Sequence, residues 1–207
     1  MVEHFILAFP AVFLIVDPFG ALPVFLAMTT RDSAEKSRAT ALKACLVAAG
    51  LMALFTVFGG VLFRFFGLTL SAFRVAGGLL LMLTALDMLR ARPPATRTSE
   101  GEEKEGDEKD DIAIVPLAMP VLAGPGSIAT VMVLMANGDG YQTGAAVLAA
   151  IAVTFLITWL VLRSAQPVKR VLGKTGLALV NRLFGLILAT IAVQFIVGGV
   201  KDLLAGK

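Results

Sequence analysis

Six apolar stretches, each long enough to cross a lipid bilayer, constrain this chain more than any other feature. A membrane-spanning helix needs about 20 predominantly apolar residues. With 57% hydrophobic residues and a mean hydropathy of +0.86, the chain is too apolar for a soluble domain of 207 residues. We predict an all-α, polytopic membrane protein with six transmembrane helices, at about residues 5–29, 40–63, 72–90, 112–136, 144–163 and 183–204.

Several functional classes find no support in the residues. The segment MVEH before the first span has no basic character and no clear cleavage site follows, so we expect that span to be retained. Cys45 is the single cysteine and His4 the single histidine, so neither a disulfide framework nor a Cys/His metal site is expected. No nucleotide-binding loop is present, and we expect no cofactor and no direct use of ATP.

The lysines and arginines predict how the chain is oriented. Most of them lie in the loops near 30–39, 90–111 and 163–182, which six spans would place on one side. The positive-inside rule assigns that side to the cytoplasm and both termini to the opposite side. The formal charge of +3 is explained by this topology and by lipid headgroups, without a nucleic-acid partner.

A polar segment divides the chain near its middle. Residues 96–111 read TRTSEGEEKEGDEKDD, a composition that buries too little apolar area to order itself. We interpret residues 93–111 as a cytoplasmic linker between a first unit, 1–92, and a second unit, 112–207.

The two units resemble each other around their prolines. Shifting the sequence around VFLIVDPFGALPVFLAM (12–28) by 106 positions onto that around LAMPVLAGPGSIATVMV (117–133) places Pro10 on Pro116 and Gly20 on Gly126. The third and sixth spans also match, because RVAGGLLLMLTAL and RLFGLILATIAVQ both begin Arg-x-x-Gly; the second and fifth match only weakly. Since three spans are an odd number, a duplicated unit would enter the membrane from the opposite face. Inverted repeats with helices broken at matching positions are typical of secondary transporters, with the binding site near the breaks.

The first and fourth spans are predicted to be broken, near Asp17–Gly20 and near 124–126. Proline removes an N–H group and clashes with the preceding turn, while glycine permits turns and a close approach of ligand. A half-helix that begins after each break offers free N–H groups and the positive end of its dipole to a carboxylate. Carbonyls freed at the preceding half-helix suit an ammonium group or a cation, so the breaks together favour a small zwitterion.

The candidate binding residues follow from the two breaks. Asp17 could bind the substrate ammonium, carry a coupled proton, or cap the second half-helix. The hydroxyls of Ser127 and Thr130 are candidates to line the site, with backbone capping as the alternative. The full set is Asp17, Pro18, Phe19, Gly20, Ala21, Gly124, Pro125, Gly126, Ser127 and Thr130.

Other polar and small residues inside the spans are candidates for coupling, gating or packing. Arg74 and Arg182 open equivalent spans, where they could hold gating ion pairs or extend to lipid headgroups, and for Arg74 the headgroups are favoured. Gln194 is predicted to hydrogen-bond another helix, with lining of the pathway as the second choice. Three glycines are expected to allow close helix packing: Gly77, Gly78 and Gly185.

Four segments resemble the MarC family of bacterial inner-membrane proteins, which includes the small neutral amino acid transporters known as SnatA. They are FLIVDPFGALPVFLAMT (13–29), RVAGGLLLMLTALDML (74–89), IAIVPLAMPVLAGPGSIATVMVL (112–134) and NRLFGLILATIAVQFIVGGV (181–200). The resemblance implies six spans, a bacterial inner membrane, and transport of amino acids such as glycine and alanine. Ala21 stands where relatives commonly have Asn, and Ser127, its counterpart in the second unit, is the candidate replacement for that polar group.

We therefore expect a secondary carrier that works by alternating access and is coupled to a proton or to sodium. Its expected partners are a small neutral amino acid, the coupling ion and the bilayer; a homo-oligomer stays open. Export of a drug or metabolite by the same architecture, a channel, and a non-transporting assembly protein remain alternatives. An enzyme is not expected, because Asp17 and Asp87, the best pair for an intramembrane aspartyl protease, lack the sequence context of such enzymes.

Overall fold

The computed structural model describes residues 2–30, 32–90, 113–136, 138 and 140–205, and within these ranges it contains helices and no strand. The predicted linker at 93–111 lies outside the described residues. The all-α class predicted from hydropathy is confirmed. The helical elements are α1 (Val2–Val16), α2 (Ala21–Met28), α3 (Ala34–Phe66), α4 (Leu70–Leu89), η1 (Ala113–Leu122), α6 (Pro125–Ala136), α7 (Gly140–Arg163) and α8 (Ala165–Leu204).

Four helices are long and apolar enough to cross a membrane: α3, α4, α7 and α8. Two further pairs pass the same test only when joined. The pair α1 and α2 is bent by 44° at its break, and the pair η1 and α6 by 55°. The described chain thus has four candidate membrane spans, or up to six if each bent pair is one span, and both bends lie at the Pro/Gly segments singled out in the sequence.

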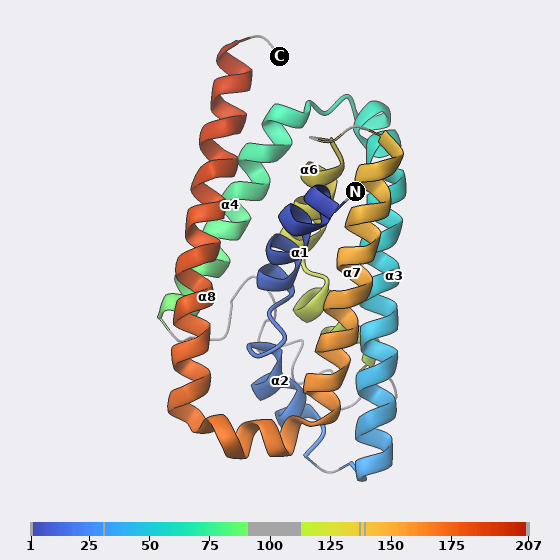
Figure 1. Cartoon of the computed structure of the whole chain (residues 1–207), viewed down its shortest axis with the longest axis vertical. Coiled ribbons are helices and arrows are strands. Elements are labelled where there is room, and N and C mark those ends of the chain that lie inside the picture. Colours follow the sequence, from blue (N-terminus) through green and yellow to red (C-terminus); the bar gives the residue numbers. More distant parts are fainter. Residues whose placement is uncertain (1, 31, 91–112, 137, 139, 206–207) are drawn as a thin grey trace.

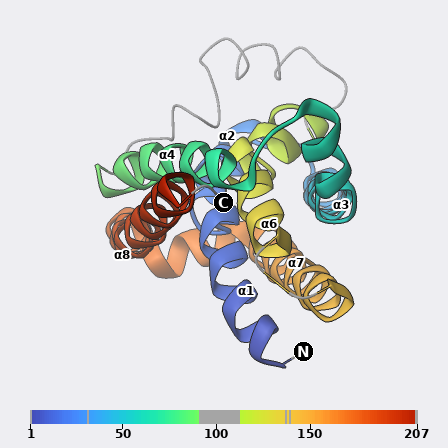
Figure 2. The same cartoon turned by 90° about the horizontal axis from the view of Figure 1, so that it is seen from above.

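The two bent pairs lie in the middle of the molecule (Figures 1 and 2). Helices α4 and α8 pack together on one side of them, and α3 and α7 on the other. Helix α1 contacts α6, and α2 contacts η1, so the two bent pairs also contact each other. This arrangement surrounds the backbone interruptions with protein, which an interrupted helix needs inside a membrane.

Close approach of α4 to its neighbours depends on glycine. A Cβ atom at Gly78 would lie 2.9 Å from the carbonyl oxygen of Ala192 in α8, and one at Gly77 would lie 2.9 Å from Cβ of Ala129 in α6. A Cβ at Gly185 in α8 would lie 3.0 Å from the carbonyl oxygen of Ala85. The predicted packing role of these three glycines is confirmed.

Helix α8 is bent where Gly173 has a φ of +63°, a conformation that glycine adopts without strain. Before the bend, its first residues lie across one end of the bundle, and after it the helix rises beside α4 (Figure 1). The helix begins at Ala165, well before the predicted start at residue 183. The hydropathy pattern finds only the apolar part of a helix, whereas backbone hydrogen bonding continues into its charged part.

Candidate functional site

Asp17 forms the junction of the first broken pair. Its backbone N–H donates to the carbonyl of Phe13 at 3.0 Å, and its own carbonyl accepts from Ala21 N–H at 3.1 Å. It has a left-handed φ of +52°, and its side chain is buried, with 1% of the residue exposed. Oδ1 of its carboxylate accepts a hydrogen bond from Gly20 N–H at 3.0 Å. Of the three roles considered for Asp17, the described contact corresponds to capping: it caps the turn at residues 18–20 that leads into α2, whose own N-cap residue, Gly20, provides no side-chain cap.

Gly20 is fixed by this carboxylate. A Cβ atom at Gly20 would lie 2.6 Å from Cγ of Asp17, so a larger residue would displace the side chain. Pro18 and Ala21 are buried beside it. Phe19 is half-buried, and its ring makes an edge contact with that of Phe184 in α8, with 6.2 Å between centroids.

The second break is held by a different set of contacts. A Cβ at the buried Gly124 would lie 2.7 Å from the carbonyl oxygen of Pro120, so only glycine fits this turn. The Thr130 hydroxyl donates to the carbonyl of Gly126 at 2.9 Å, and the Ser127 hydroxyl donates to that of Leu122 at 3.4 Å. Both hydroxyls are buried and serve backbone carbonyls around the break, which matches the capping alternative.

The two broken pairs approach each other at Gly126. A Cβ atom there would lie 3.4 Å from Cδ1 of Ile15, the residue two positions before Asp17, and 3.5 Å from Cδ2 of Leu81 in α4. A cavity of about 150 Å³ opens at this contact. Its lining comes from α1, α4 and the second break: Ile15, Leu80, Thr84, Gly124, Pro125, Gly126 and Ser127.

The cavity unites only part of the predicted site. Four predicted residues line it, all from the second break: Gly124, Pro125, Gly126 and Ser127. Residues 17–21 and Thr130 are not among the lining residues. Sequence reasoning missed Ile15, Leu80 and Thr84, although Thr84 carried a usable signal as a hydroxyl residue within the apolar third span.

The size and chemistry of this cavity limit what it can hold. An engineered protein cavity of about 150 Å³ accepts benzene, and glycine and alanine have no more non-hydrogen atoms than benzene. The lining includes two hydroxyls, of Ser127 and Thr84, and no charged side chain. The lining also includes the first turn of α6. Pro125 has no N–H, and the Ile128 N–H donates to the Gly124 carbonyl at 3.1 Å. The N–H groups of Gly126 and Ser127 are therefore those that could favour an anion.

The predicted gating residues lie away from this cavity. The sequence favours lipid headgroups for Arg74, whereas the structure pairs its Nη1 with Oδ2 of Asp202 in α8 at 2.6 Å. Arg182 is exposed. The side chain of Gln194 is exposed on the outside of α8, so within the described part of this single chain it does not line the cavity, and its predicted hydrogen bond to another helix stays a prediction. The face of α8 toward α4 carries Ala192, and a residue two positions further along a helix points to the opposite side.

Comparisons with known proteins cover nearly the whole chain. A family model described as "MarC family integral membrane protein" matches residues 2–204. The UPF0056 membrane protein MJ1677 of Methanocaldococcus jannaschii is 41% identical over 202 residues, 98% of each chain. YvbG of Bacillus subtilis is 37% identical over 204 residues (98% of this chain, 97% of the relative), and YhcE of Escherichia coli 32% over 198 residues (96% and 92%). These names describe membrane proteins and specify no substrate. No solved structure matches the chain.

Proposed function

Because the chain belongs to the MarC family of integral membrane proteins, we propose that it is a secondary transporter of small neutral amino acids, of the glycine and alanine class. The observation that carries this proposal is the cavity of about 150 Å³ where the second break meets Ile15 of the first broken pair. The resemblance of both break motifs to those of SnatA transporters supports the same substrate class.

The cavity offers complementary groups to a zwitterion. The N–H groups of Gly126 and Ser127, in the first turn of α6, would bind the carboxylate, since a helix N-terminus carries a partial positive charge. The Ser127 and Thr84 oxygens would accept from the ammonium group. The side chains of Ile15 and Leu80 would limit the substrate side chain to a hydrogen or a methyl group.

Alternating access would follow from two inverted units, residues 1–92 and 112–207. In Figure 1, α1 and α2 run downward, α3 upward and α4 downward, while η1 and α6 run upward, α7 downward and α8 upward. These opposite directions and the matching positions of the breaks support the inverted repeat. Rocking of one unit against the other would expose the cavity to each side in turn.

Orientation and coupling complete the proposal. The basic residues at the start of α3, the end of α7 and the start of α8 would face the cytoplasm, and both termini would face the periplasm of a bacterial inner membrane. The coupling ion would be a proton carried at Asp17 or sodium held by carbonyls freed at the breaks.

Counterflow in proteoliposomes tests the function. Vesicles preloaded with unlabelled alanine should accumulate labelled alanine transiently and with saturation, and protein-free vesicles should not. Glycine should compete and phenylalanine should not, because the cavity is too small for its ring together with its backbone. Imposed proton and sodium gradients identify the coupling ion. Flux that rises linearly with alanine concentration would instead indicate a channel, and absence of alanine flux with export of a larger solute would indicate an efflux protein.

A further inference from the structure

A larger hollow lies at the end of the bundle where α2 and α7 end and α3 and α8 begin, and it shares no lining residue with the cavity at the breaks. Its volume is about 600 Å³. Three cationic side chains belong to its lining, those of Arg38, Arg163 and Lys169, against one carboxylate, that of Asp32. The Arg163 guanidinium also lies over the Trp159 ring, 5.2 Å from its centroid.

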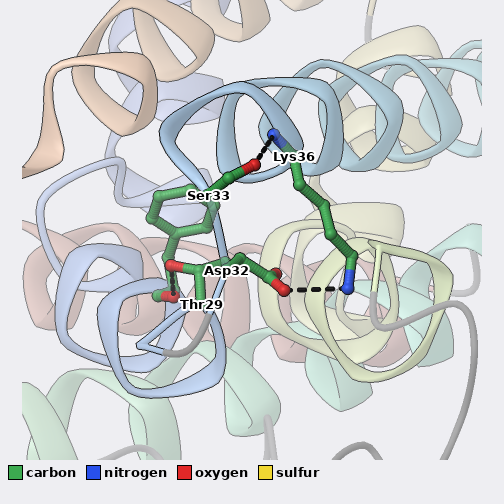
Figure 3. Close-up of polar contacts among 5 residues, drawn as sticks. Thr29, Asp32, Ser33 and Lys36 are labelled. Carbon is green, nitrogen blue, oxygen red and sulfur yellow. Dashed lines mark hydrogen bonds and ion pairs between the residues drawn. The ribbon is translucent and has the colours of Figure 1, made fainter.

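The one carboxylate of this hollow is already engaged. Oδ1 of Asp32 lies 2.8 Å from Nζ of Lys36, one helical turn further along (Figure 3). The backbone N–H of Lys36 donates to Oγ of Ser33 at 3.2 Å. The Thr29 hydroxyl donates to the backbone carbonyl of Phe25 at 2.8 Å. With Asp32 paired to Lys36, the lining has a surplus of positive charge and suits an anion.

An apolar groove continues from the basic hollow. It has a volume of about 540 Å³, and it lies between α2 and the part of α8 around the bend at Gly173. Leu26, Thr30 and Lys169 line both hollows, so the two adjoin. The groove is otherwise walled largely by apolar side chains: Pro23, Ala27, Leu177 and Ala178.

Two buried oxygens on these walls have no hydrogen-bond partner among the described residues. They are Oδ2 of Asp32 in the basic hollow and Oδ1 of Asn181 in the groove. Buried acceptors are normally satisfied by a donor. A ligand of these hollows would therefore combine an anionic group with hydroxyl donors and an apolar part.

We propose that the two hollows bind one anionic phospholipid. The phosphate lies in the basic hollow near Arg38 and Lys169, and an acyl chain lies in the groove between α2 and α8. Basic pockets between transmembrane helices on the cytoplasmic side suit anionic headgroups, and Trp159 is of the residue type enriched at that interface. A free phosphate would satisfy the basic hollow but would leave the groove without an occupant.

Such a lipid would contact the second half of the first broken pair. Helix α2 contributes Leu26 to both hollows, and Thr30, two residues after its end, also lines both, so bound lipid would pack against the half-helix that follows the Asp17 break. The lipid site does not depend on which solute the protein carries.

Lipid titration of the purified full chain in detergent tests this proposal. Phosphatidylglycerol should bind, as counted by native mass spectrometry, and should raise the melting temperature more than phosphatidylcholine with the same acyl chains. The double variant Arg38→Gln/Lys169→Gln should bind phosphatidylglycerol about 25-fold more weakly, since each basic residue near an anionic lipid surface contributes about a factor of five. The matched control Arg90→Gln/Arg170→Gln removes two exposed charges from the same end, outside both hollows, and should bind nearly as the parent does.

Three outcomes would overturn the proposal. Equal binding of the two lipids would show that the hollows do not select an anion. An equal loss in both double variants would show that only overall charge matters. If glycerol phosphate, which lacks acyl chains, binds as tightly as the lipid, the site is one for a soluble phosphate and the groove has no part in it.

Discussion

Replacing Asp17 with alanine is expected to lower the melting temperature by about 5–10 °C and to abolish alanine exchange. Loss of the hydrogen bond from Gly20 N–H removes a cap, which is worth about 1 kcal/mol. Holding alanine in the left-handed conformation of residue 17 lowers the free energy of unfolding by about a further 1–2 kcal/mol. In a chain of this length, each kcal/mol lowers the melting temperature by about 2–4 °C. Transport should fail because the two halves of the first broken pair lose their junction.

Two further substitutions at this position separate charge from geometry. Asparagine tolerates the left-handed region, and its carbonyl accepts from Gly20 N–H, so Asp17→Asn should unfold near the parent temperature and keep exchange. Glycine relieves the backbone strain but cannot cap, so Asp17→Gly should fall between asparagine and alanine. Thermal unfolding and counterflow of the three variants check this order. An Asp17→Asn protein as unstable as Asp17→Ala would contradict the capping role. One that exchanges alanine but no longer accumulates it against a pH step would make Asp17 the proton carrier.

Alanine substitutions at Gly126 and Gly124, two residues apart, should fail in different ways. At Gly126 the new methyl group would make contacts of 3.4 Å with Ile15 and 3.5 Å with Leu81, which the packing accommodates. That methyl would narrow the cavity. A single methylene in a pocket changes discrimination by about 10–200-fold, so exchange of alanine should fall at least about tenfold more than exchange of the smaller glycine.

At Gly124 the added methyl group meets backbone. The carbonyl oxygen of Pro120 would lie 2.7 Å from it and cannot rotate away as a side chain could. Overpacking of this kind lowers the free energy of unfolding by about 1–3 kcal/mol. We therefore expect Gly124→Ala to lower the melting temperature and to reduce glycine and alanine exchange alike. Size-selective loss in Gly124→Ala, or equal loss of both substrates in Gly126→Ala, would contradict the assignment of the cavity as the substrate site.

The spans and the breaks could be predicted because they depend on local sequence. An apolar run of sufficient length, or a proline next to glycine, has its effect within a few residues. The packing glycines Gly77, Gly78 and Gly185 were readable for a similar reason, since small residues let transmembrane helices approach closely.

The lining of the cavity could not be predicted, because it depends on how the helices are rotated against one another. Ile15 and Thr84 reach the cavity only through the contacts of α1 and α4 with α6. The outward position of Gln194 follows from the face that α8 turns toward α4, and the pairing of Arg74 with Asp202 joins residues 128 positions apart. Within the first break, sequence reasoning located Asp17 but could not choose among its three roles.

Protection of a cysteine in the cavity by substrate tests the central claim most directly. Cys45 is buried and is the single cysteine of the chain, so a Cys45→Ala background allows one thiol to be placed at Ser127, on the cavity wall, and another at the exposed Tyr141 as a control. Alanine at ten times its Kd should slow labelling of the Ser127→Cys thiol by a small methanethiosulfonate about tenfold, as expected if labelling requires an empty cavity. Phenylalanine should not slow it, and labelling at position 141 should not change. Unchanged labelling of Ser127→Cys, in a protein that still exchanges alanine, would place the substrate elsewhere and contradict the account.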